Sequence, residues 1–445
     1  MDKLPEALVF QILSRLDDSA DVARCQVAWK TFHTVSPDLR SINLRWPLQR
    51  YIELRSRVSN ASSSSPLTSP LKTIFLNLIS NSRVLESVHI SVENFPLDVS
   101  ITDVQDNGDD LYLNDWAFVK EWLPRVSGAL KSLSISDFWV QSCWRQSEVL
   151  SMVSACCHKL LELEVKNAWL SLENLNPMPM LTSLTLERIR LDDNNDISQV
   201  NKCLPNLQVL NLIDIEGLEL PVIRLINLKT CHWTVGWSSV TLITPNLITL
   251  RLECIRLAAL YVQAPMLSHF HLALDYAGAF FVKEFENLRT LLLESSYMYS
   301  LIIKFPRIET IENLTLNSRD SHIRSSKFTL KNLLAGFRTV TSLCLNSRAW
   351  TELETCYDPF NRVDWEGRNG LKTFRGYLLL VDPSLTFTLV AWLLDQCFNL
   401  VDVSLLIHRN VAPHVSRGFI VRCMARWPNV NWRWECGKKE SKILG

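Results

Sequence analysis

Two histidines and an arginine are the residues of this sequence best suited to binding chemistry. His269 and His271 stand two positions apart in an apolar stretch, so on a strand both side chains point to the same face. Such a pair could help to bind a metal ion or an acidic ligand, and Arg251 in a neighbouring stretch would favour the acidic ligand. The simpler interpretation is two surface histidines on a solvated strand face, and we prefer it.

Catalytic motifs are absent from the sequence. It contains no G-x-S-x-G, H-E-x-x-H, Walker or G-x-G-x-x-G motif, and its 12 glycines leave few places for a phosphate-binding loop. The 12 cysteines are scattered without a C-x-x-C pair, which argues against zinc knuckles and favours buried, reduced thiols in a cytoplasmic or nuclear protein. We therefore expect a protein that is not an enzyme and holds neither a metal ion nor a cofactor.

Composition and charge narrow the class of protein further. The chain has 445 residues, of which 46 are basic and 46 acidic, so its net charge is zero, whereas nucleic-acid binders usually show a basic excess. Hydrophobic residues make up 47%, which is typical of a folded protein. The first residues lack the charged and apolar regions of a signal peptide, and no apolar run approaches the roughly 20 residues that cross a bilayer. We expect neither a nucleic-acid partner nor a membrane.

The elements that position these side chains follow from one recurring pattern, apolar-x-x-apolar-x-apolar. Its best-spaced copies start 19 to 26 residues apart, close to the period of about 20–29 residues of a leucine-rich repeat. Copies begin at Leu85, Leu130, Leu160, Leu181, Leu207, Leu228, Leu247, Leu267 and Leu288, and weaker ones at Ile311, Val340, Leu371 and Leu400.

Stacking of these repeats predicts a parallel sheet with a continuous leucine core, because one repeat cannot bury its apolar face alone. We expect an irregular solenoid over residues 71–436, with the strands on its concave face and helices or loops on its convex face. A helix is expected over Trp116–Val126, a terminal cap over Trp427–Trp434, and a polar tail over residues 437–445.

The polar positions between the leucines form the expected binding surface. It is polar and mixed in sign, which suits a protein or peptide better than a polyanion, although a partner could instead bind the loops or the convex side. The residues predicted to bind a substrate protein are Thr249, Arg251, Glu253, His269, His271, Thr290 and Glu294.

The N-terminal segment Leu4–Val35 is expected to form two short helices and the start of a third. Leu4-Pro5 opens the first helix, Ser19 caps the second with Asp21 in its first turn, and the third stops at Ser36-Pro37. So small a segment has little core, so its apolar surface must be buried against either the next domain or a partner. One face of the first helix is predicted to carry Leu8, Ile12, Leu13 and Leu16; later apolar residues are Val22, Cys25, Val27, Phe32 and Val35.

The order of short motifs in this segment resembles an F-box, especially the plant type. The matching motifs are Leu4-Pro5, Ile12-Leu13-Ser14-Arg15-Leu16, Ala23-Arg24-Cys25 and Lys30-Thr31-Phe32, while Trp29 departs from the usual small residue. Together with the repeats, this resemblance implies an α/β F-box/LRR protein. Its parts would be a three-helix F-box over residues 1–45, a connecting helix and Ser/Pro-rich linker over 46–70, and the solenoid.

The resemblance also implies a function. In such proteins the F-box docks on a Skp-type adaptor, which links to a cullin scaffold, and the repeats hold a target protein while a separate enzyme transfers ubiquitin. The chain would then be a non-catalytic specificity subunit of a ubiquitin ligase. The residues implied in adaptor binding or its support are Leu4, Pro5, Leu8, Ile12, Leu13, Leu16, Val22, Cys25 and Phe32.

Two other classes remain open at this point. The chain could be a small-molecule receptor, similar to the plant hormone-sensing F-box proteins, with an anionic ligand near Arg251, His269 and His271. It could also be a protein-binding scaffold that never joins a ligase. Thermal stabilisation by candidate ligands would favour the receptor, and failure to capture the adaptor and cullin would favour the scaffold.

Overall fold

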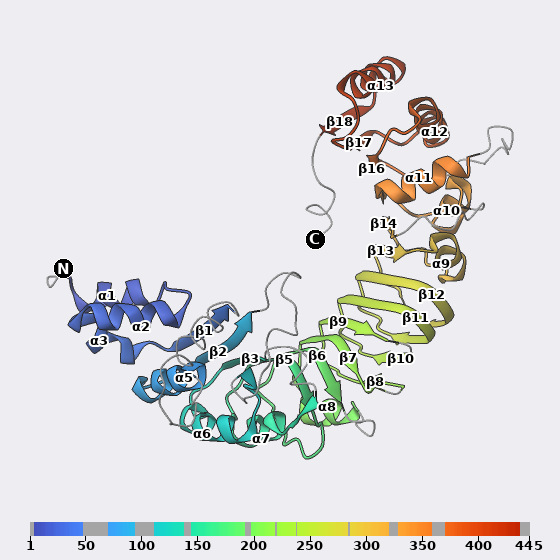
Figure 1. The fold of residues 1–445 in the computed structure, drawn as a ribbon. Helices are drawn as coiled ribbons and strands as arrows, with labels where there is room; N and C mark the ends of the chain where they lie inside the picture. The colour runs from blue at the N-terminus through green and yellow to red at the C-terminus, as the bar shows by residue number, and fades with distance from the viewer. Residues whose placement is uncertain are drawn as a thin grey trace. The chain divides into compact units, whose positions relative to one another are not determined.

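The computed structural model describes residues 4–47, 70–93, 111–137, 144–191, 197–218, 220–236, 238–283, 285–319, 328–357 and 370–436. The chain divides into two compact units, Met1–Leu228 and Lys229–Gly445, which we describe in turn (Figure 1). In the described ranges, every helix is too short or too polar to cross a bilayer.

The first unit begins with three short helices, α1 (Glu6–Leu13), α2 (Ser19–Ala28) and α3 (Lys30–Val35), followed by a 3-10 turn at Ser36–Asp38. Pro5 stands immediately before α1. Asp18, not the predicted Ser19, caps α2, because its carboxylate accepts a hydrogen bond from the Ala20 N–H at 2.9 Å. The extended backbone of Trp29 separates α2 from α3. The three expected helices are therefore present.

A strand, β1 (Ser41–Pro47), follows these helices, and its last two residues occupy the start of the connecting helix predicted from residue 46, where the chain is extended instead. Ile42, Leu44 and Trp46 alternate with more exposed residues, which is the pattern of a strand buried on one face. β1 pairs in parallel with β2 (Ser87–Glu93) over seven residue pairs. Residues 48–69, which hold most of the predicted linker, lie outside the described residues.

The parallel sheet of the first unit runs in the order β1, β2, β3 (Ser132–Ser136), β5 (Glu162–Leu170), β6 (Ser183–Leu191) and β7 (Val209–Glu216). The short β4 (Gln146–Ser147) pairs with the end of β5, and β8 (Val222–Ile223) follows β7. The helices between strands are α5 (Pro70–Asn81), α6 (Trp116–Val126), α7 (Val149–Cys156) and α8 (Ser198–Cys203). The predicted helix over Trp116–Val126 is therefore confirmed.

The second unit follows the same repeat plan, and its last two helices are 14 residues long each. Its strands pair in parallel in the order β9 (Thr230–Val235), β11 (Thr249–Gln263), β12 (His269–Lys283), β13 (Thr290–Ser295), β14 (Asn313–Ser318), β15 (Ser342–Leu345), β16 (Thr373–Leu378), β17 (Asp402–Ile407) and β18 (Asn431–Cys436). β10 (Ser238–Ile243) pairs with the later part of β11. The helices are α9 (Met298–Lys304), α10 (Leu330–Gly336), α11 (Ser347–Thr355), α12 (Pro383–Gln396) and α13 (Pro413–Arg426).

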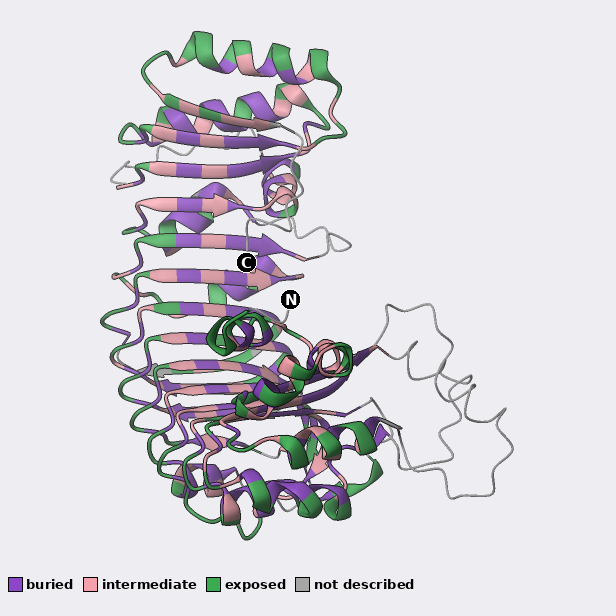
Figure 2. Cartoon of the chain, turned by 90° about the vertical axis from the view of Figure 1, so that its left-hand side faces the viewer, coloured by how far each residue is buried: buried purple, intermediate pink, exposed green. Residues whose placement is uncertain are grey.

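Alternation along each strand separates a buried face from an open one (Figure 2). In the second unit, Leu250, Phe270, Leu291, Leu314 and Leu343 stand at matching register positions on five successive strands, and all are buried. Within each unit the predicted leucine core of a leucine-rich-repeat solenoid is confirmed. The polar residues between the leucines lie on the opposite face of the strands.

Candidate functional site

The three N-terminal helices form a small core of their own. Leu13, which is 1% exposed, packs in it with Val9 from the same helix. The buried members are Val9, Leu13, Val22, Val35 and Leu39, and the partly buried residues packed against them are Phe10, Leu16, Cys25 and Phe32. Of the nine residues predicted to contact or support the adaptor, five therefore belong to this core or its margin.

A second apolar row remains on the surface of the same segment. Leu4, Leu8 and Ile12 are 37%, 45% and 45% exposed. Leu8 and Ile12 stand four residues apart and so lie on one side of α1, and Leu4 precedes the helix by two residues. We call these three residues the exposed stripe. The prediction that Leu13 shares a face with Leu8 and Ile12 is therefore wrong, because the buried face of α1 is the one that carries Val9 and Leu13.

Helix α2 adds an exposed apolar residue that the predicted site left out. Val27 is 91% exposed, whereas Val22, which the sequence placed among the adaptor residues, is buried. Five positions along a helix correspond to a large rotation about its axis, so the two valines face different directions. Helical spacing measured from the core residue Val22 would have found this difference.

Polar contacts attach the three helices to the sheet of the first unit. The hydroxyl of Ser19 accepts a hydrogen bond from the backbone N–H of Asn43 in β1 at 2.8 Å. Arg83, which follows α5, forms an ion pair with Asp38 at 2.7 Å and donates its backbone N–H to Pro37 at 2.9 Å. The helices are thus anchored on one side, while the exposed stripe is not part of their core.

All seven residues predicted for substrate binding lie on the open face of the second unit. Thr249, Arg251 and Glu253 alternate along β11 with buried Leu250 and Leu252. The same alternation places His269 and His271 of β12, and Thr290 and Glu294 of β13, on this open face. The register sets Arg251 beside His271, with His232 of β9 on its other side.

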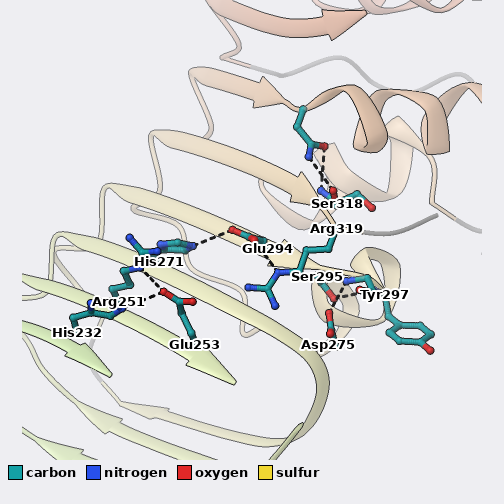
Figure 3. Close-up of polar contacts among 12 residues, drawn as sticks. His232, Arg251, Glu253, His271, Asp275, Glu294, Ser295, Tyr297, Ser318 and Arg319 are labelled. Carbon is teal, nitrogen blue, oxygen red and sulfur yellow. Dashed lines mark hydrogen bonds and ion pairs between the residues drawn. The ribbon is translucent and has the colours of Figure 1, made fainter. Parts of the chain in front are cut away.

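Glu253 joins two of these strands (Figure 3). Its carboxylate accepts a hydrogen bond from Arg251 Nε at 2.6 Å and lies 3.1 Å from His232 Nε2. Burial raises the pKa of Glu253, but the hydrogen bonds from Arg251 and His232 outweigh burial and hold the pKa below its ordinary value.

Glu294 forms a second junction (Figure 3). Its carboxylate lies 3.4 Å from His271 Nε2 and accepts a hydrogen bond from Arg319 Nε at 2.7 Å. The His271 imidazole lowers the pKa of Glu294 most, burial opposes this effect, and the Arg319 guanidinium helps to bring the pKa to about 2. Arg319 follows β14, so this junction reaches beyond the predicted residues.

The two histidines of β12 have different partners despite sharing a face. His269 is exposed and its Nδ1 lies 2.7 Å from the Ser268 hydroxyl, whereas His271 is turned to Glu294. Among the described residues, no three His, Cys, Asp or Glu side chains gather in a way that could hold a metal ion, and the ten described cysteines are free thiols.

A polar hollow of about 600 Å³ opens on this face beside Glu294. Besides Arg251, His271 and Glu294, it is lined by Leu292, Asn317, Ser318, Arg319, Asn346, Ser347 and Arg348. Sequence reasoning missed residues 317–319, at the end of β14, and residues 346–348, after β15, because both groups lie outside the repeat pattern.

Comparison with known proteins settles the family. No model of a protein family matches the sequence. The chain is, however, 40% identical over 443 residues to an F-box/LRR-repeat protein of Arabidopsis thaliana, and the match covers 98% of this chain and 97% of that protein. The relatedness thus extends from the N-terminal helices through the repeats of both units, and the chain belongs to the F-box/LRR-repeat proteins.

Proposed function

We propose that this chain is the substrate-recognition subunit of a Skp–cullin–F-box ubiquitin ligase. The N-terminal helices dock a Skp-type adaptor, and the adaptor links the chain to a cullin scaffold. The repeats hold a target protein while a separate conjugating enzyme supplies ubiquitin. In this role the chain binds two proteins and carries out no chemistry of its own.

The exposed stripe is the observation that supports adaptor docking. Burying one leucine or isoleucine side chain contributes about 1.5–3 kcal/mol, so three half-exposed side chains in a row offer a partner substantial apolar area. The segment has its own buried core, so the stripe can be covered by a partner without opening that core. A docked adaptor would bury Leu4, Leu8 and Ile12 together.

The open face of the second unit supports the other half of the proposal. It presents fixed charges of both signs, held by the junctions at Glu253 and Glu294. Charges of both signs, fixed in place, select a complementary protein surface and set its register. This arrangement suits a folded or peptide target better than a polyanion.

Reconstitution in cells tests the proposal as a whole. The tagged full chain should co-precipitate the Skp-type adaptor and the cullin, and addition of the conjugating enzymes to the precipitate should attach ubiquitin to a co-precipitated target. A chain with Ile12→Asp should lose the adaptor, the cullin and the ubiquitin transfer together. Ala7→Asp is the matched control, because Ala7 is exposed in the first turn of α1, where a negative charge is favourable.

Capture of a target without adaptor or cullin by the unmodified chain would contradict the ligase assignment and favour a non-ligase scaffold. Capture of the adaptor and the cullin by the Ile12→Asp chain would contradict docking at the exposed stripe while leaving the ligase assignment in place.

A further inference from the structure

The polar hollow of the second unit combines residues from four consecutive strands, β11 to β14, and from the segments that follow β14 and β15. Arg251, His271 and Glu294 enter it from β11, β12 and β13, and Arg319 enters from the segment after β14 (Figure 3). Asn346 and the first two residues of α11 line its far side. A volume of about 600 Å³ exceeds that of a single side chain, so the hollow can take a side chain together with part of its backbone.

Among the residues that line this hollow, positive charge outweighs negative charge. Its lining contains three arginines and one histidine but only one carboxylate, that of Glu294. Arg251 and Arg319 are each held by a hydrogen bond from Nε, to Glu253 and Glu294 respectively. A guanidinium has five N–H donors, so both side chains are fixed in place with terminal N–H groups left to bind a ligand.

Asn317 brings an unpaired buried polar group to the hollow. Its side chain lines the hollow and is only 8% exposed, and its Oδ1 has no hydrogen-bond partner among the described residues. A buried amide oxygen without a hydrogen bond costs free energy unless a ligand pairs with the amide. Turned one way, the same amide presents N–H donors to an acceptor.

Asn346, in contrast, is fully used in building the wall. Its Oδ1 accepts hydrogen bonds from the Ala349 N–H at 2.8 Å and the Ser318 N–H at 3.1 Å, and its Nδ2 donates to the Ser318 carbonyl at 2.9 Å. Asn346 therefore caps α11 and ties its first turn to the end of β14. The positive end of the α11 dipole is thereby held at the hollow, which further favours an anion.

We propose that this hollow binds an anionic side chain of the target protein, a carboxylate or a phosphate, between Arg251, Arg319 and Asn317. This inference rests on the proposed function, because it names the chemical class of the target segment. Two fixed guanidinium groups with N–H donors to spare match the oxygens of such a group. Binding would also pair the buried amide of Asn317.

Three fluorescent peptides that differ at one central residue test the inference directly. The flanks are neutral, and the central residue is serine, phosphoserine or glutamate. We expect the purified full chain to bind at least one anionic peptide about tenfold or more tighter than the serine peptide, as charge-assisted hydrogen bonds require. Comparison of the phosphoserine and glutamate peptides tells which source of negative charge the hollow prefers.

Substitutions locate the binding. Arg319→Gln should reduce the affinity for the preferred anionic peptide about tenfold. Arg251→Gln should do the same, and because the Arg251 side chain is 50% exposed, against 31% for Arg319, its loss disturbs the packing less. The matched control is Arg289→Gln in the same unit, whose exposed side chain pairs with Glu312 at 3.5 Å, and it should leave the affinity unchanged.

Equal binding of all three peptides, no binding of either anionic peptide at millimolar concentration, or equal losses from Arg251→Gln and Arg289→Gln would each overturn the inference. Adaptor binding is measured on the same preparations. Selective peptide binding by a chain that fails to bind the adaptor would refute the ligase function and leave the anion site standing. The opposite result would refute only the anion site.

Discussion

At the scale of the residue, shared carboxylates hold the open face of the second unit in place. Glu253 contacts Arg251 and His232, and Glu294 contacts His271 and Arg319, so each carboxylate joins side chains from different repeats. Partly buried pairs of this kind are less screened by salt than pairs on an open surface. The charges of this face are therefore oriented by contacts within the chain, which would lower the cost of ordering them on binding a partner.

The low pKa of Glu294 predicts how stability depends on pH. Its pKa is about 2 in the folded chain against an ordinary value of 4.5, so its ionised form stabilises the fold above pH 4.5 and this contribution is lost as pH falls toward 2. The melting midpoint of Glu294→Gln should lie below that of the unmodified chain at neutral pH. The gap should narrow between pH 4.5 and 2 when both are followed by circular dichroism.

The exposed residue Glu309 supplies the control for this measurement. Glu309→Gln removes a carboxylate from a turn of the same unit, away from the junction. A gap for Glu294→Gln that stays constant over the whole acid range would show that its carboxylate does not carry the proposed stabilisation.

Truncation of two neighbouring residues of α1 should cost very different amounts of stability. Leu13→Ala removes a buried side chain from the small helical core and should cost about 2–5 kcal/mol, whereas Ile12→Ala at a half-exposed position should cost about 0.5 kcal/mol or less. Hydrogen exchange of the amides of residues 6–35 reports on this local stability. Equal acceleration of exchange in both variants would contradict the assignment of core and stripe.

At the scale of the element, the sheet of each unit depends on one alternation repeated from strand to strand. The buried positions stand in register across β11, β12, β13 and β14, so each apolar side chain packs between those of the neighbouring repeats. Stability in such an array is roughly the sum of repeat and neighbour terms. A single substitution therefore has a local and predictable effect.

The assignment of alternate residues of β11 to the buried and the open face of the sheet can be tested. Leu250→Ala should lower the free energy of unfolding by about 2–5 kcal/mol, because Leu250 is fully buried. Thr249→Ala, one position away on the open face, should change it by about 0.5 kcal/mol or less. Urea unfolding of the full chain measures both, and similar losses would contradict the phase described here.

Two glycines should give opposite results when changed to alanine. A Cβ at Gly278 in β12 would lie 1.9 Å from the Ala258 carbonyl oxygen, so Gly278→Ala should lower the melting temperature. A Cβ at Gly418 in α13 has open space, so Gly418→Ala should stabilise the helix by roughly 0.5–1 kcal/mol. A decrease of the same size for both variants would contradict the close approach of β11 and β12.

The strands were the most predictable part of this chain, and the polar hollow the least. The spacing of Leu250 and Leu252 reveals a strand by itself, because the side-chain period of a strand is local. The strand β1 was missed because its short alternation stands among charged residues beside a helical segment. Asn317 and Asn346 meet only through the stacking of repeats, which no local spacing expresses.

At the scale of the whole molecule, one family relationship and two proposed binding surfaces describe the chain. The F-box helices are attached to β1 and α5 of the first unit by Ser19 and Arg83, and the chain passes from them directly into β1. The polar hollow lies within the second unit. The two surfaces are therefore built from separate sets of residues, and substitutions should separate adaptor docking from target binding.

Titration of the purified Skp-type adaptor into the full chain, followed by calorimetry, tests the central claim most directly. Ile12→Asp places a charge in the exposed stripe, and burying it against the adaptor should raise the Kd at least about a hundredfold, while Ala7→Asp should leave the Kd unchanged. Amide exchange of the repeats should be the same in all three chains. An adaptor that binds the Ile12→Asp chain as tightly as the unmodified chain would contradict docking at the exposed stripe.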